Sequence, residues 1–128
     1  MPEKKTLERS RRDKREGKAP STQAGEFVRE EMEHIREGKH GARSPKQAIA
    51  IGLSKARRAG VKLSPPKKGK ASARTRKQAE RDLARAKSGR KSSPTRSRAR
   101  LRALKREGRS AASHSALSRQ ARTARKKR

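Results

Sequence analysis

The sequence contains no Cys, Trp or Tyr and a single Phe, and Leu, Ile, Val and Phe together supply only 13 of its 128 residues. Without Cys, the chain has no disulfide framework, no thiolate zinc site and no cysteine nucleophile. Few large apolar residues combined with high net charge are typical of largely disordered chains, so we expect only a small core. An enzyme pocket needs a packed scaffold. We therefore predict that the protein is not an enzyme and has no cofactor.

Acidic residues and long apolar runs are also scarce. The chain has 12 Asp and Glu against 41 Lys and Arg, a formal net charge of +29. No stretch approaches the roughly 18 apolar residues of a membrane span, and the N-terminus lacks the apolar run of a secretory signal. The sequence therefore predicts a cytoplasmic protein with no membrane contact, whose natural partner is a polyanion.

The charge changes along the chain and divides it into parts. Residues 1–20 carry a net charge of +4 and residues 21–38 a net charge of −3. Residues 39–70 hold ten cations and no acid, and residues 71–128 carry +18. From these shifts and the turn residues we predict four parts: a basic N-terminal arm (1–20), a helical hairpin (21–61), a Pro- and Lys-rich linker (62–74) and a basic, helix-prone C-terminal tail (75–128).

The acidic segment has the pattern of a helix. Ser21 or Thr22 is suited to cap its start, and Gly38 is suited to end it in the left-handed conformation. Its apolar residues share one helical face, and they are Phe27, Val28, Met32 and Ile35. Its acids are expected on the outer face, where they partly neutralise cations of the next helix; these are Glu30, Glu31, Glu33 and Glu37 opposite Lys55, Arg57 and Arg58.

A second helix is predicted after Ser44, which is the expected N-cap. Pro45 suits the first turn, Gln47 completes a capping box, and Gly60 lies at the C-terminal end. Its apolar stripe is formed by Ile49, Leu53 and Ala56. The two helices are expected to pack as a hairpin of marginal stability, because the apolar seam between them is thin.

Outside the hairpin, the apolar residues are too sparse to hold helices against solvent. Four stretches combine high helix propensity with very few Leu residues, and they are 2–16, 75–87, 94–107 and 111–126. We expect them to fluctuate and to become ordered when phosphate neutralises their charge. The predicted fold class is mostly α: a small helical hairpin with largely disordered or fluctuating-helix basic arms.

The basic residues are the strongest functional signal. Lys and Arg that neutralise DNA phosphates release counterions, which drives binding. His40 is added because it precedes a helix N-terminus, where backbone N–H groups receive phosphate. The predicted nucleic-acid contacts are Lys39, His40, Arg43, Lys46, Lys55, Arg57, Arg58, Lys67, Lys68, Lys70, Arg96, Arg98, Arg100, Arg102, Lys105, Arg106, Arg109, Arg125, Lys126, Lys127 and Arg128.

The shortage of aromatics favours double-stranded DNA over RNA. Modules that read single-stranded RNA stack its bases on aromatic side chains, and Phe27 is expected in the hairpin seam instead. Basic ribosome-associated tails also lack aromatics, so RNA stays open as a partner.

The three His residues are scattered, at His34, His40 and His114. A metal site needs convergent ligands, and nothing in the sequence brings three together, so we predict no metal site. His34 is expected to form a surface pair with Glu30 or Glu31. The segment 38–41 lacks the ending of a phosphate-binding loop, and no nucleophile motif is present, so no catalytic residue is predicted.

The segment HIREGKHG at residues 34–41, with RSPKQAIAIGLSKARRAG at residues 43–60, resembles a domain of unknown function in small, very basic bacterial proteins. Some of those proteins carry labels such as DNA-binding or plasmid-stabilisation protein. The resemblance implies a bacterial nucleoid setting and no catalytic residues. Ser-Pro steps at Ser44, Ser64 and Ser93 also resemble elements of linker-histone tails. We interpret Ser44 and Ser93 as helix caps and Ser64 as part of the linker.

Together these observations predict a non-enzymatic, weakly sequence-specific DNA-binding protein of the nucleoid-associated type, which binds the phosphate backbone through Arg and Lys. Two alternatives stay open. One is an RNA- or ribosome-associated basic protein. The other is an antitoxin-like plasmid maintenance factor whose acidic helix holds a protein partner. Self-association through the hairpin is a further expectation.

Overall fold

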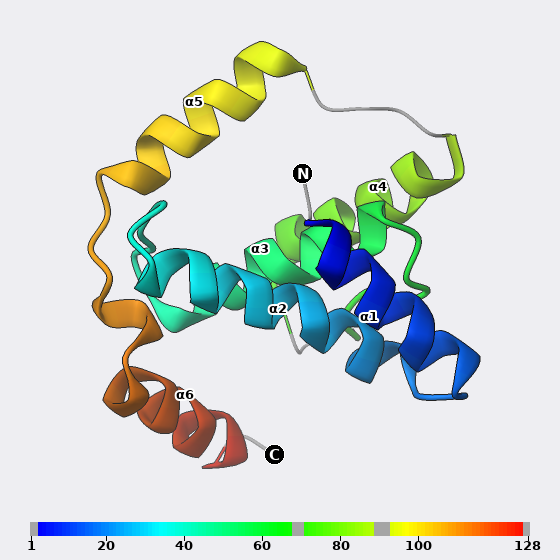
Figure 1. The fold of residues 1–128 in the computed structure, drawn as a ribbon, viewed down its shortest axis with the longest axis horizontal. Coiled ribbons are helices and arrows are strands. Elements are labelled where there is room, and N and C mark those ends of the chain that lie inside the picture. Colours follow the sequence, from blue (N-terminus) through cyan, green and yellow to red (C-terminus); the bar gives the residue numbers. More distant parts are fainter. Residues whose placement is uncertain (1–2, 68–70, 89–92, 127–128) are drawn as a thin grey trace. The chain divides into compact units, whose positions relative to one another are not determined.

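The computed structural model describes residues 3–67, 71–88 and 93–126, and in these ranges the chain is mostly helical, as predicted (Figure 1). Its elements within these ranges are α1 (Lys4–Arg15), α2 (Pro20–Arg36), α3 (Pro45–Arg58), α4 (Ala73–Ser88), α5 (Pro94–Lys105), a 3-10 turn η1 (Ser110–Ala112) and α6 (His114–Lys126). The chain divides into a first unit (Met1–Glu30 with Gly52–Lys91) and a second unit (Glu31–Ile51 with Ser92–Arg128), so α2 and α3 contribute residues to both.

The helices end where the sequence predicts. Gly38 follows α2 with φ of 80° and Gly60 follows α3 with φ of 106°, and this left-handed conformation suits Gly. The predicted caps Ser21 and Thr22 are wrong, because α2 begins at Pro20 and both residues lie inside its first turn. Pro fits the first helical turn because its fixed φ is helical and its missing N–H has no partner there.

Two predicted N-caps are confirmed by hydrogen bonds. The Ser44 hydroxyl accepts from the Gln47 backbone N–H at 3.3 Å, and the Ser93 hydroxyl accepts from the Arg96 N–H at 3.4 Å. The Gln47 side chain accepts from the N–H of Arg43 at 2.6 Å, one residue earlier than in a standard capping box.

The first unit has a small apolar core between α2 and α3. Ala24, Phe27, Ala56 and Val61 are buried there, with Leu7, Leu53 and Leu63 packed against them. The predicted seam is therefore confirmed for Phe27, Leu53 and Ala56. The core also includes Leu7 of α1 and Val61, which follows α3.

Gly52 allows α3 to approach α2 closely. A Cβ atom built at Gly52 would lie 2.6 Å from the Cα of Val28 and 2.9 Å from its backbone N. Both atoms belong to the backbone, so they cannot move aside as a side chain does. The helix contact in the first unit therefore depends on the missing side chain at Gly52.

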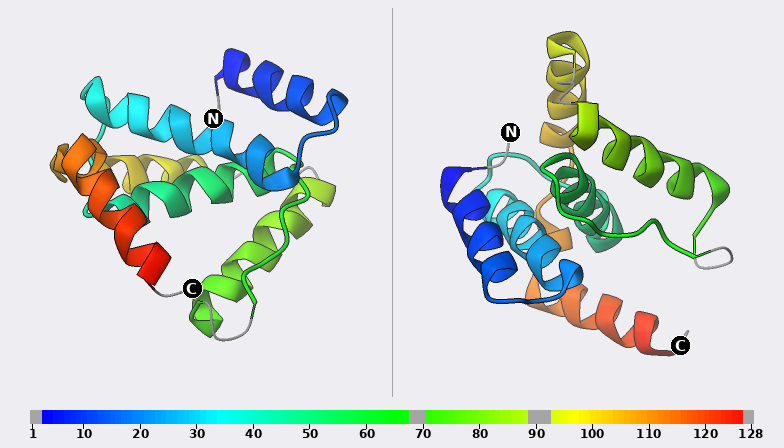
Figure 2. Two further views of the ribbon diagram at one scale, coloured as in Figure 1. Left: turned by 90° about the horizontal axis from the view of Figure 1, so that it is seen from below. Right: turned by 90° about the vertical axis from the view of Figure 1, so that its right-hand side faces the viewer.

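A buried carboxylate ties α1 to α2. Glu30 is 2% exposed, and its Oε1 accepts from the backbone N–H of Glu3, the N-cap of α1, and from the Thr6 hydroxyl at 3.3 Å. Because Glu3 makes no side-chain cap of its own, Glu30 supplies the negative charge at the positive end of the α1 dipole. The two helices run antiparallel, side by side (Figures 1 and 2).

A second buried carboxylate ties α4 to α3. Asp82 is 1% exposed and accepts from the Ser54 hydroxyl at 2.5 Å and from the Gln78 amide at 3.2 Å. The Arg58 Nε lies 3.9 Å from the same carboxylate. Asp82 therefore connects side chains of α3 with its own helix.

In the second unit, backbone hydrogen bonds join the turn after α2 to the end of α5. The N–H of Gly41 donates to Leu104 O at 2.8 Å, and the N–H of Ala42 donates to Gly108 O at 3.0 Å. Arg36 donates from Nε to Ala112 O at 3.1 Å. The apolar side chains buried in this unit are Met32, Ile35, Ala42, Ala48, Leu104, Ala111 and Ala112.

The structure does not match a hairpin with disordered arms. The predicted arms contain α1, α4, α5 and α6, close to the predicted helix ranges, and the predicted linker ends earlier, because α4 begins at Ala73. Counting apolar residues missed the buried carboxylates that hold α1 and α4 and the backbone hydrogen bonds at the end of α5. The expected acidic outer face of α2 is also corrected, because Glu30 and Glu31 are buried.

The close approach at Gly52 leads to a mutational prediction. Gly52→Ala should lower the free energy of unfolding by about 1–3 kcal/mol, because the added methyl forces the two helices apart. Gly25→Ala on α2 is the matched control, because a Cβ there meets nothing within 4 Å. It should stabilise by about 0.5–1 kcal/mol through helix propensity alone. Urea unfolding measures both, and stabilisation by Gly52→Ala would contradict the packing.

Candidate nucleic-acid interface

Most of the predicted contact residues that the structure describes lie at the surface. The exposed ones are Lys39, Arg43, Lys46, Lys67, Arg96, Arg98, Arg100, Arg102, Lys105, Arg106, Arg109 and Arg125, while Lys55 and Arg58 are half-buried. Four predicted contacts lie outside the described residues, namely Lys68, Lys70, Lys127 and Arg128, and the side chain of Lys126 lies outside them as well.

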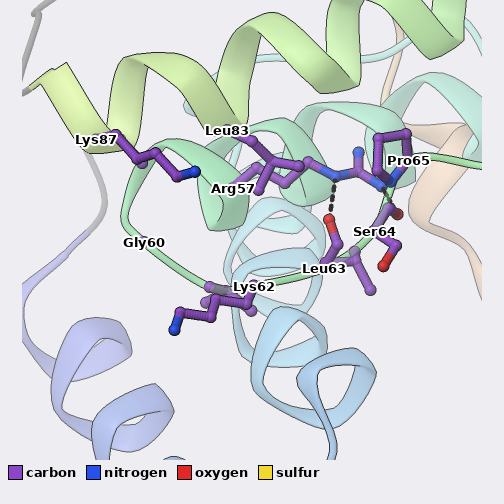
Figure 3. A pocket seen from close by; sticks show the side chains of 10 residues that line it. Arg57, Gly60, Lys62, Leu63, Ser64, Pro65, Leu83 and Lys87 are labelled. Atoms are coloured by element: carbon purple, nitrogen blue, oxygen red, sulfur yellow. Dashed lines mark hydrogen bonds between the residues drawn. The ribbon is translucent and has the colours of Figure 1, made fainter.

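Arg57 is a predicted contact that the structure places inside the first unit. It is 7% exposed; its Nε donates to Leu63 O at 3.1 Å, and a terminal amino group donates to Ser64 O at 3.0 Å (Figure 3). Burial lowers the pKa of Arg57 from its ordinary value, and the charge of Asp82 partly offsets this shift. Its guanidinium holds the segment after α3, and this internal role disfavours the predicted DNA contact.

His40 is also placed inside, in the second unit. It is 8% exposed, its Nδ1 lies 2.9 Å from Gly41 O, and its Nε2 lies 3.1 Å from Glu31 Oε2. Both ring nitrogens therefore have protein partners. This placement disfavours the predicted direct contact of His40 with phosphate.

Two predicted groups of cations, far apart in sequence, meet around one hollow of the second unit. The hollow has a volume of about 650 Å³, and Lys39, Lys105 and Arg109 line it together with Gly38, His40 and Gly41. The Gly41–Leu104 and Ala42–Gly108 hydrogen bonds bring its two walls together. At Gly41 an added Cβ would lie 2.0 Å from Glu107 O, so only Gly permits this approach.

The hollow is cationic on balance. Three positive side chains line it, and one acid, Glu107, lies among them. The Lys39 ammonium is also 3.3 Å from Glu37 Oε2, so part of its charge is already paired. Exposed ion pairs of this kind contribute only about 0–1 kcal/mol, so a phosphate can displace Glu37 at little cost.

The exposed cations of α5 lie on two sides of the helix. Helical spacing places Arg98, Arg102, Lys105 and Arg106 on one side and Arg96 and Arg100 on another. The α5 residue that is buried is Leu104. Ala99 and Ala103 are exposed and fall between the two cationic rows. We call these six cations the α5 cationic rows.

Sequence reasoning missed two cations in the first unit. Lys62 and Lys87 line a hollow of about 600 Å³ whose wall includes Leu63, Leu83 and Ala86 (Figure 3). Their spacing along the chain gives no signal of this arrangement. It depends on how Arg57 folds the segment after α3.

The expectation that no three metal-ligating side chains converge is wrong. Ligand atoms of Glu31, His34 and His40 all lie within 4.8 Å of one another in the second unit. Glu31 and His34 are three residues apart on α2, a spacing that places both on one helical face. That spacing is the one feature of the sequence that indicated a shared site for Glu31 and His34. The approach of His40 to these two residues depends on the turn after α2.

Comparison with known protein families identifies one that covers just over half of the chain. The model of DUF6496, a family of unknown function, matches residues 4–68, so the chain belongs to this family. No curated protein and no solved structure matches the chain. Among the helices of the described residues, none is long and apolar enough to cross a membrane.

The approach at Gly41 leads to a second prediction. Gly41→Ala should open the cationic hollow, because its methyl group overlaps the Glu107 carbonyl, and the amide of Ala42 should then lose protection from hydrogen exchange. Gly108→Ala in the same unit is the matched control, because its Cβ meets nothing within 4 Å. NMR-detected exchange measures both variants. Equal protection of Ala42 in the two would show that the two walls are not joined as described.

Proposed function

We propose that this protein is a non-enzymatic, weakly sequence-specific DNA-binding protein of the nucleoid-associated type, which binds the phosphate backbone through Arg and Lys. The observation that carries the proposal is the run from Arg96 to Arg109, in which seven cations are all exposed and α5 itself contains no acid. Arg is suited to this role because its guanidinium fork binds phosphate oxygens in pairs.

The arrangement of the α5 cationic rows supports binding along a groove. The major groove of B-DNA is about 12 Å wide and admits an α-helix, with a row of phosphates on each side. Arg98 and Arg102 face one such row while Arg96 and Arg100 face the other. The small side chains Ala99 and Ala103 lie between them and allow the helix to approach the bases. Such a surface positions the protein on DNA but reads little sequence.

The cationic hollow extends this surface at the C-terminal end of α5. Lys105 belongs both to the α5 cationic rows and to the hollow, so Lys39 and Arg109 continue the line of positive charge. Its volume of about 650 Å³ exceeds what a single phosphate requires. We propose that one backbone phosphate occupies it.

Double-stranded DNA is favoured over single-stranded RNA as the partner. The chain has a single Phe and no Tyr or Trp, and that Phe27 is fully buried in the core of the first unit. No aromatic side chain is therefore available to stack an unpaired base. Recognition of backbone charge on a duplex requires none.

Burial of acids weakens the case for an antitoxin-like protein. That alternative needs an acidic α2 surface for a protein partner. Of the five acids in residues 21–38, Glu30 and Glu31 are buried and occupied by contacts within the chain. The remaining acids leave a smaller surface for such a partner.

The salt dependence of DNA binding tests the proposal. The logarithm of affinity should fall linearly with the logarithm of salt concentration, with a slope of about −0.9 for each phosphate contacted. Removing Arg98, Arg102 and Arg106 by substitution with Gln should make the slope less negative by about 2.7, because three contacts are lost. Fluorescence anisotropy of a labelled duplex measures both slopes.

The matched control is Arg11, Arg12 and Arg15 on α1, each replaced by Gln. These three are also exposed Arg residues on a helix, and both triple variants lower the net charge from +29 to +26. The control should change the slope far less. Equal slopes in the two variants would contradict an α5 interface, and displacement of DNA by ribosomal RNA at a lower concentration than by unlabelled duplex would favour the RNA alternative.

A further inference from the structure

One carboxylate and two imidazoles come together in the second unit. Glu31 and His34 belong to α2, and His40 follows the turn at its end. Their ligand atoms lie within 4.8 Å of one another, and Glu31 Oε2 and His40 Nε2 are 3.1 Å apart. None of the α5 cationic rows is part of this cluster, although His40 also lines the cationic hollow.

The fold builds the cluster from local structure. Glu31 and His34 share a helical face at a spacing of three residues, the spacing with which helical carboxylate proteins bind one metal ion. Gly38, with φ of 80°, turns the chain back after α2 and brings His40 to the same face. The N–H of Gly41 then holds this turn by its hydrogen bond to Leu104 O.

The orientation of His40 is the second observation that points to a metal ion. Its Nδ1 donates to Gly41 O at 2.9 Å, and its Nε2 donates to Glu31 Oε2 at 3.1 Å, a proton that a bound ion would replace. Metal-ligating His residues nearly always donate their other ring N–H to a carbonyl or carboxylate in this way. The His34 and His40 rings meet edge to face, with centroids 6.0 Å apart, so both sit beside the same carboxylate.

The distances and burial suit a small divalent ion. Ligands at about 2.0–2.1 Å in a tetrahedral zinc site lie roughly 3.3 Å from one another, close to the 3.1 Å between Glu31 Oε2 and His40 Nε2. Glu31 is fully buried and His40 is 8% exposed, so two of the three donors are already desolvated, while half-buried His34 lies closer to solvent. A bound cation would neutralise the buried carboxylate.

We propose that Glu31, His34 and His40 bind a divalent transition-metal ion of the zinc class, with water as the fourth ligand. Two imidazole nitrogens and one carboxylate oxygen match the preference of such ions and not that of Mg²⁺ or Ca²⁺. The ion would fasten the turn at Gly38 to α2. The observations behind this site do not depend on the proposed DNA binding, although the two sites adjoin at His40.

Titration of metal-free, full-length protein with Zn²⁺ tests the proposal. Isothermal calorimetry should give one ion per chain, and Zn²⁺ should raise the midpoint of thermal unfolding by about 5 °C or more at saturation. Substituting Co²⁺ should give the visible absorption of a four-coordinate nitrogen and oxygen site. These readouts require no DNA.

Three variants identify the ligands. His34→Gln and Glu31→Gln should each weaken Zn²⁺ binding at least about 10-fold, the loss seen even for residues that only orient a ligand. His114→Gln on α6 is the matched control and should bind as the unmodified protein does. His34 is only half-buried, so circular dichroism of His34→Gln should confirm that the variant is folded. No binding by the unmodified protein would overturn the site, as would equal affinities of His34→Gln and His114→Gln.

Discussion

The fold of this chain depends on where its few carboxylates lie. The chain has an excess of 29 positive charges, yet four of its 12 acids are buried, namely Asp13, Glu30, Glu31 and Asp82. Three of them connect segments that are separate in sequence: Glu30 caps α1, Asp82 joins α4 to α3, and Glu31 meets His40. Removing such a carboxylate leaves its buried hydrogen-bond donors without an acceptor, which costs about 1–3 kcal/mol.

The same arrangement produces the surface on which the proposed function rests. The helix α5 contains no acid, so its exposed cations have no ion-pair partner within their own helix. In residues 71–128 there are only three acids, and one of them, Asp82, is buried against α3. Burial of acids in the core is therefore compatible with the proposed binding of a polyanion at the surface.

Local signals predicted much of the fold, and longer-range contacts did not follow from them. The sequence predicted the caps at Ser44 and Ser93 and the turns at Gly38 and Gly60, because each of these signals acts within about four residues of its own position. The seam at Phe27 and Leu53 followed from helical periodicity. The roles of Glu30 and Glu31 did not follow from this periodicity, because an acid on a helix ordinarily indicates a side that faces solvent. The hollow and the Glu31–His34–His40 cluster depend on the turn after α2 and its bonds to Leu104 and Gly108.

The most direct test compares Asp82→Asn with Glu80→Gln on the same helix. Both variants remove one negative charge from α4, but Asp82 is buried and Glu80 is exposed. If buried carboxylates hold the fold, Asp82→Asn should lower the free energy of unfolding by about 1–3 kcal/mol and expose α4 amides to hydrogen exchange. Glu80→Gln should change that free energy by less than about 0.5 kcal/mol. Equal free energies of unfolding and equal α4 exchange in the two variants would contradict the account.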